Sequence, residues 1–163
     1  MLDIHPTARI SKLADIEDSV RGTKLIVGPG VMIDAFVKIK PVGGLGDVTI
    51  AEGAQINSGC VIYSGNGVRI GKNVLIAANC TLAATNHEFK RSDIPIVEQR
   101  FQPSRGGIVI EDDVWIGAGT VLLDGSIVRQ GAVIAAGSLV RGEIEAYGIY
   151  AGHPLRLIRR RGA

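Results

Sequence analysis

The chain has few of the residues that would mark several common classes of protein. Its 163 residues include only seven aromatic side chains, and the formal net charge is +2. So small a charge gives no electrostatic basis for binding nucleic acid. There is no run of about eighteen apolar residues, so no transmembrane segment is expected. The first residues show no secretory signal. The sequence therefore predicts a cytoplasmic protein.

What the sequence does contain is a six-residue repeat. Aliphatic residues recur at intervals of six through the second half of the chain, at Ile110, Ile116, Leu122, Val128, Ile134 and Val140. A period of six fits neither the 3.6-residue turn of a helix nor the two-residue alternation of a single strand. It fits a solenoid whose coil is a three-sided prism, because each side then sends one aliphatic and one small residue inward.

The same spacing extends back to the start of the chain. Aliphatic anchors form trios at 4, 10, 16; 27, 33, 39; 50, 56, 62; 70, 76, 82; 110, 116, 122; and 128, 134, 140. Every lengthened step falls between trios, so all insertions lie at one corner of the coil. We predict one all-β domain over residues 1–163 with about six coils. An excursion loop is expected over about 83–107, and a short C-terminal tail over about 146–163.

The two cysteines follow the register of the repeat. Cys60 and Cys80 each stand four residues after a central anchor, Ile56 and Ile76. We expect them to stack on the inner face that these anchors share, with Thr120 and Ser138 in the corresponding places of later coils. Two small buried thiols without further ligands would fill the core, and would be neither a metal site nor a nucleophile.

Three segments of the chain carry a family resemblance. They are Thr85-Asn86-His87, the run IEDDVWIGAG over 110–119, and the closing run AGHPLRLIR over 151–159. Together they resemble the sugar acetyltransferases of the hexapeptide-repeat superfamily. The resemblance implies a single-stranded left-handed parallel β-helix, a homotrimer and acetyl-CoA as co-substrate. Handedness comes from the resemblance alone, since the usual crossover rule favours a right-handed turn.

His87 is the candidate catalytic residue. In the similar acetyltransferases the matching histidine is the general base. Its position supports this role independently, because a long irregular loop in an otherwise regular protein is usually functional. Imidazole can take a proton from an attacking hydroxyl or amine near neutral pH.

Other site residues follow from the resemblance and from side-chain chemistry. Asn57 matches an acceptor-binding asparagine that the family supplies across a subunit interface. Asn86 and Asp93 are polar loop residues able to bind acceptor hydroxyls.

The co-substrate is expected to contact glycine- and alanine-rich corners and basic side chains. The matching positions for pantetheine are Gly117, Ala118, Ala135 and Ala136. The phosphates are expected against Arg141, Arg156 and Arg159, because guanidinium suits bidentate phosphate contact. The chain departs from the family where Arg141-Gly142 replaces a common Thr-Lys pair, so the phosphate contacts must be rearranged.

The leading interpretation is acetyl transfer to a hydroxyl or amine of a carbohydrate, in a surface-polysaccharide or nucleotide-sugar precursor. A γ-type carbonic anhydrase would need three histidines converging on zinc. His5, His87 and His153 are far apart in the repeat, so no metal is expected. A non-catalytic β-helix used as an assembly module remains the alternative. The histidine-bearing loop and the closing signature argue against it.

Overall fold

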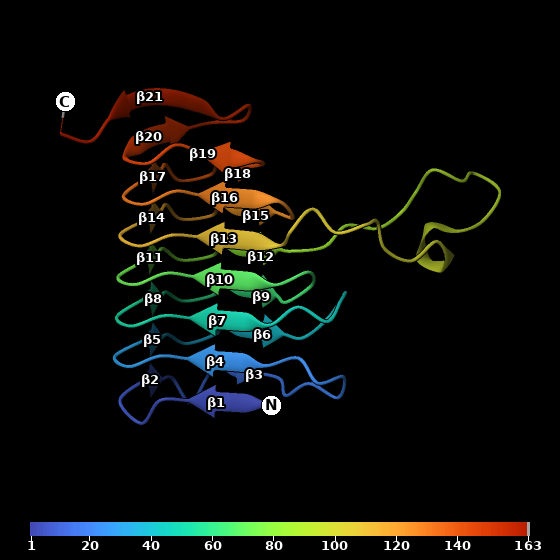
Figure 1. Ribbon diagram of the computed structural model, residues 1–163, viewed down its shortest axis with the longest axis horizontal. Helices are drawn as coiled ribbons and strands as arrows, with labels where there is room; N and C mark the ends of the chain where they lie inside the picture. The colour runs from blue at the N-terminus through green and yellow to red at the C-terminus, as the bar shows by residue number, and fades with distance from the viewer. Residues whose placement is uncertain (163) are drawn as a thin grey trace.

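The computed structural model describes residues 1–162 and has three parallel sheets wrapped around one core (Figure 1). Sheet A contains β1 (Leu2–Ile4), β4 (Leu25–Val27), β7 (Val48–Ile50), β10 (Val68–Ile70), β13 (Ile108–Ile110), β16 (Ser126–Val128) and β19 (Glu143–Ile144). Sheet B contains β2 (Arg9–Ile10), β5 (Met32–Ile33), β8 (Gln55–Ile56), β11 (Leu75–Ile76), β14 (Trp115–Ile116), β17 (Val133–Ile134), β20 (Gly148–Ala151) and β21 (Arg156–Arg160). Sheet C contains β3 (Asp15–Ile16), β6 (Lys38–Lys40), β9 (Val61–Tyr63), β12 (Thr81–Ala83), β15 (Val121–Leu123) and β18 (Leu139–Val140).

Successive coils stack in the register that the repeat predicts. Ile116 pairs with Ile76 in the coil before it and with Ile134 in the coil after it. Each coil thus repeats the same three sides, and the chain forms a left-handed parallel β-helix, as expected. The predicted all-β fold is confirmed.

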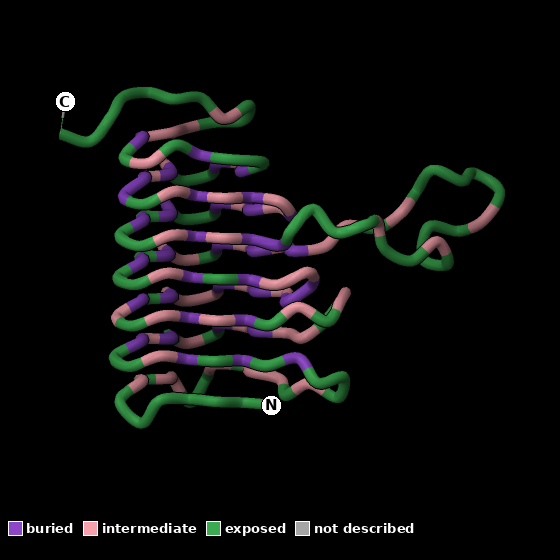
Figure 2. The backbone as a smooth tube through the Cα atoms, in the orientation of Figure 1, coloured by how far each residue is buried: buried purple, intermediate pink, exposed green. Residues whose placement is uncertain are grey.

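The core is a narrow column of aliphatic side chains. Ile56, Ile76, Ile116 and Ile134 are at most 1% exposed. The first coil is more open, with Ile4 39% exposed, because no coil lies beneath it (Figure 2). Burial of each large aliphatic side chain contributes roughly 1.5–3 kcal/mol, so the column is the main source of stability.

The small residues of the repeat are buried, but on a different side from the one expected. Cys60, Cys80, Thr120 and Ser138 are all at most 2% exposed. Each comes just before a strand of sheet C. Side chains two apart in an extended segment share a face, so Cys60 shares a face with Ile62 rather than with Ile56. The prediction of one shared face with the sheet B anchors was therefore wrong.

The insertions lie at one corner, as predicted. The connections over 17–24, 41–47, 64–67 and 84–107 all lead from sheet C to sheet A. We call this edge the C–A corner, and the edge between sheets B and C the B–C corner. Figure 1 shows the longest connection, the excursion loop, projecting well beyond the prism.

The C-terminal segment differs from the expected tail. β20 pairs in parallel with β17 and so begins a seventh coil, and β21 folds back antiparallel onto β20. Arg161 secures this end through an ion pair with Asp113, at 3.0 Å between Nη1 and Oδ2. Residue 163 lies outside the described residues. Among residues 1–162, no helix is long and apolar enough to cross a membrane.

Candidate active site

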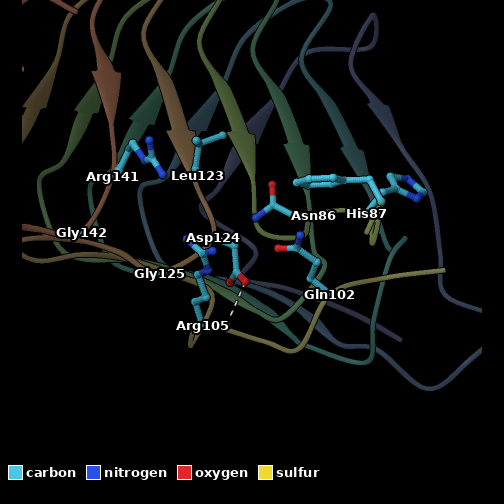
Figure 3. Close-up of a pocket in the computed structure, with 10 residues that line it drawn as sticks. Asn86, His87, Gln102, Arg105, Leu123, Asp124, Gly125, Arg141 and Gly142 are labelled. Carbon is cyan, nitrogen blue, oxygen red and sulfur yellow. Dashed lines mark hydrogen bonds between the residues drawn. The ribbon is translucent and has the colours of Figure 1, made fainter. Parts of the chain in front are cut away.

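A pocket of about 530 Å³ opens at the C–A corner, where the excursion loop leaves and rejoins the prism. Figure 3 shows its lining side chains, which come from the loop root and from the two coils that follow. They are Asn86, His87, Phe89, Gln102, Arg105, Leu123, Asp124, Gly125, Arg141 and Gly142. The pocket thus combines two amides, two guanidinium groups, a carboxylate and an imidazole.

The loop root is a short antiparallel ribbon. The backbone N–H of Gln102 donates to Asn86 O at 2.8 Å, and that of Glu88 donates to Arg100 O at 3.0 Å. His87 lies opposite Phe101 in a β-bridge. The outgoing and returning limbs therefore hold each other, and His87 sits on a defined backbone rather than on a free loop.

The His87 ring is packed but open to solvent. Its centroid lies 4.8 Å from that of Phe101, with the planes tilted by 39°. The side chain is exposed. Figure 3 shows the imidazole at one end of the pocket, turned away from Asp124 and Arg141. This orientation leaves the ring facing outward, where a substrate or another molecule could approach it.

The tip of the loop lies apart from the pocket. Asp93 forms an ion pair with Arg91, and the Gln99 amide donates to Arg91 O at 2.7 Å. The 3₁₀ helix η1 (Ile96–Glu98) follows at the far end of the excursion (Figure 1). Within one subunit the structure therefore brings Asn86 and His87 together and leaves Asp93 outside the pocket.

Three of the polar pocket side chains were not identified from the sequence. They are Gln102, Arg105 and Asp124. Nothing in the hexapeptide pattern calls for a carboxylate at Asp124. Asp124 directly follows β15, at the corner where other coils carry insertions. That position was the only sequence feature that could have indicated a site residue. Gln102 and Arg105 lie in an irregular segment, where spacing carries no information about contacts.

Half of the residues expected to bind the co-substrate or the acceptor lie at the other edge of sheet C. Asn57, Gly117, Ala118, Ala135 and Ala136 follow strands of sheet B and line the B–C corner. The coils are close here: a Cβ atom on Gly117 would approach Ala136 N to 2.4 Å, so only glycine fits. The Asn57 amide donates to Ile76 O at 2.8 Å.

The three arginines expected to bind phosphate also lie in two separate parts of the prism. Arg141 lines the pocket at the C–A corner. Arg156 and Arg159 lie exposed on β21, at the C-terminal end of the prism. One subunit therefore does not gather all of the predicted site residues into a single cleft.

The two cysteines and the remaining two histidines lie outside the pocket. A hydrogen bond with the Cys80 thiol, together with burial, raises the pKa of the Cys60 thiol, so this group stays protonated and is a poor nucleophile. His5 contacts Thr7 beside the first coil, and His153 lies in the turn between β20 and β21. Within the described part of the chain, no group of three His, Cys, Asp or Glu residues could hold a metal ion.

Comparison with known proteins assigns the family. The family described as "Bacterial transferase hexapeptide (six repeats)" matches residues 107–142. WbbJ of Escherichia coli K12, which is described as a putative lipopolysaccharide biosynthesis O-acetyl transferase, is 32% identical over 145 residues, covering 85% of this chain and 70% of WbbJ. The chain belongs to the bacterial hexapeptide transferase family. The membership predicted from the three sequence segments is thereby confirmed.

Two further similar proteins are informative. Gamma carbonic anhydrase 2 of Arabidopsis thaliana mitochondria is 28% identical over 79% of this chain, which spans only 50% of that protein. In this chain His5 follows β1 and His153 precedes β21, and these strands lie at opposite ends of the prism (Figure 1). The histidines therefore do not converge on one site, as a zinc-binding carbonic anhydrase would require. The N-acyltransferase AntD of Bacillus cereus, solved with dTDP-4-amino-4,6-dideoxyglucose and coenzyme A, superposes with a TM-score of 0.82 at 24% identity, covering 99% of this chain and 84% of AntD. That likeness supports the fold.

Proposed function

We propose that this protein is an acetyl-CoA-dependent acetyltransferase acting on a hydroxyl or amine of a carbohydrate, as part of surface-polysaccharide or nucleotide-sugar synthesis. The observation that carries the proposal is the exposed imidazole of His87, fixed at the mouth of a polar pocket on a hexapeptide transferase prism. The assigned role of WbbJ and the ligands bound to AntD support this choice of substrates. A cytoplasmic location, where acetyl-CoA is available, is part of the same proposal.

The reaction needs one group that can accept and return a proton. His87 takes the proton of the acceptor hydroxyl or amine as its oxygen or nitrogen attacks the thioester carbonyl. The carbon–sulfur bond then breaks, and the departing thiolate of coenzyme A receives the proton from the imidazolium. A backbone N–H at a coil corner would stabilise the oxyanion formed between these steps. No covalent enzyme intermediate is required.

The remaining pocket side chains suit a polar, anionic ligand. The amides of Asn86 and Gln102 can donate to and accept from sugar hydroxyls. Arg105 and Arg141 add two guanidinium groups, which favour phosphate. In the proposed complex Arg141 contacts a phosphate of coenzyme A, and Arg156 and Arg159, at the C-terminal end of the prism, are further candidates for phosphate contact.

A second subunit would complete the site. The pocket lies at one edge of sheet C and the glycine- and alanine-rich corner at the other. In a closed cyclic trimer with sheet C facing the axis, the C–A corner of one subunit meets the B–C corner of the next. That arrangement would bring Asn57, Gly117 and Ala118 of one subunit against His87 of its neighbour.

Exposed apolar side chains on the excursion loop are consistent with such an interface. Ile96 is 55% exposed and Val97 75% exposed, on a segment that projects beyond the prism. Phe89 and Phe101 on the same loop are also exposed. Apolar side chains gathered on a projecting loop are expected to pack against a neighbouring subunit, as the proposed trimer would allow.

Disrupting this contact should dissociate the trimer. The double substitution Ile96→Asp, Val97→Asp places charges on the apolar tip and is expected to give monomers in sedimentation velocity, with loss of activity. Lys90→Ala alters an exposed polar residue of the same loop and should leave the trimer intact. A wild-type protein that sediments as a fully active monomer would contradict the proposed assembly.

The proposed activity is tested by measuring thiol release from acetyl-CoA. The enzyme should release coenzyme A in the presence of an acceptor drawn from sugars, amino-sugars, nucleotide-sugars or glycolipids. Acetyl-CoA alone should raise the melting temperature, because a ligand bound only to the folded state stabilises it. A non-catalytic assembly module would release no thiol with any acceptor. Turnover with aromatic amines alone would refute the carbohydrate acceptor.

A further inference from the structure

Asp124 is a buried carboxylate in the lining of the pocket, between Arg141 and His87 (Figure 3). It follows β15 directly and is 5% exposed. A carboxylate so far removed from water requires hydrogen-bond donors, because an unpaired buried charge is strongly destabilising. The hydrogen-bond donors around Asp124 indicate its structural role.

Those donors belong to the returning limb of the excursion loop and to the preceding corner. The backbone N–H of Arg105 donates to Oδ2 and that of Gly107 donates to Oδ1, both at 2.9 Å. The Asn66 side-chain amide adds a third bond to Oδ2 at 3.1 Å. Both carboxylate oxygens therefore accept hydrogen bonds, which fixes the orientation of the Asp124 side chain.

The carboxylate fixes the point at which the loop rejoins the prism. Gly107 adopts a φ of +78°, and a Cβ atom there would lie 2.3 Å from Gly67 O. The N–H of Gly125 also donates to Gly107 O, at 2.6 Å. This junction is tightly packed, so a change at Asp124 would be transmitted to the loop and not absorbed by free space.

The loop root carries this constraint on to His87. The returning limb held by Asp124 continues back to Gln102 and Arg100, whose backbones pair with Asn86 and Glu88 on either side of His87. Phe101, in the same limb, stacks on the imidazole. The outgoing limb is held separately, by the Asn66 N–H donating to Ala84 O at 2.8 Å and the Thr85 hydroxyl donating to Gly43 O at 3.3 Å.

We propose that Asp124 is a positioning residue that sets the orientation of His87 by clamping the returning limb of the loop. This inference rests on the proposed role of His87 as general base. Asp124 does not touch the reacting atoms. It acts by holding the backbone on which Phe101 and the partners of His87 lie.

A double-mutant cycle tests whether Asp124 acts through His87. Asp124→Asn keeps the shape but replaces one acceptor oxygen with a donor, so one backbone N–H loses its partner. The kcat should fall about ten- to a hundredfold, since small misplacements of a catalytic group have large effects. In a His87→Ala background the same change should have no further effect. Equal loss in both backgrounds would overturn the proposal.

Hydrogen–deuterium exchange gives a readout that does not depend on activity. In Asp124→Asn, the amides of 86–88 and 100–107 should exchange faster while those of β11 and β14 stay as in the wild type. Asn66→Ala removes only the third bond and should act in the same direction, less strongly. Asp93→Asn, at the exposed loop tip, is the matched control and should leave exchange at the root unchanged.

The two measurements separate failure of the clamp from failure of the proposed function. If His87→Ala is silent, the role of His87 as base is refuted, and with it the proposal that Asp124 acts on catalysis through His87. If exchange at the loop root is unchanged in Asp124→Asn, the clamp itself is refuted, whatever the kinetics show.

Discussion

Replacing His87 by alanine is expected to lower kcat by about 10²–10⁴, because the acceptor then loses the group that takes its proton in the transition state. The affinity for acetyl-CoA should change little, since the imidazole does not hold the co-substrate in the proposed complex. Steady-state thiol release gives kcat, and calorimetric titration with coenzyme A gives the affinity.

His5 provides the control for this substitution. It is an exposed histidine at the N-terminal end of the prism, hydrogen-bonded to Thr7 at 2.9 Å. His5→Ala should leave kcat as in the wild type. A His87→Ala enzyme with undiminished turnover would remove the assignment of the base while leaving the fold and family intact.

Replacing Ile116 by aspartate is expected to prevent folding. Ile116 is fully buried in β14, between Ile76 and Ile134 of the adjacent coils. An unpaired carboxylate in this column costs an amount comparable with the whole stability of a domain, ~5–15 kcal/mol. Each coil is stabilised by its neighbours, so a break in the middle separates the two halves of the prism.

Circular dichroism and size-exclusion chromatography will show the outcome for the Ile116 variants. The aspartate variant should lack the β-sheet spectrum and a cooperative melt. The control, Ile116→Val, keeps the residue apolar and should cost only about 0.5–1.5 kcal/mol. A folded Ile116→Asp protein with near wild-type melting would show that the column does not carry the stability of the prism.

The architecture could be predicted because the same six-residue spacing of buried aliphatic side chains recurs in every coil of a solenoid. The anchors at Ile76, Ile116 and Ile134 give the coil length, and the unequal steps between trios locate the C–A corner. Cys60 was placed on the wrong side because it was counted from the preceding anchor, Ile56. Its side chain shares a face with Ile62, two residues later. The C-terminal hairpin was missed because β21 lies outside the six-residue period.

The site could be predicted only in part. His87 was selected because it combines a reactive side chain with a position at the root of the long loop, and its role as base stays a prediction. Asp124 was not found, since its partners Arg105 and Gly107 approach it through an irregular segment. Asn57 and Gly117 were chosen by resemblance, and a single subunit places them at another corner. Residues that meet across an interface have no common spacing within one chain.

Direct observation of the transferred group tests the central claim. Isotopically labelled acetyl-CoA would be incubated with the wild-type enzyme and the acceptor that supports the fastest thiol release, and the product examined by mass spectrometry. We expect one labelled acetyl group on a hydroxyl or amine of the sugar, formed by the wild type and barely by His87→Ala. Label that stays on acetyl-CoA, or appears in free acetate with no acetylated carbohydrate, would contradict it.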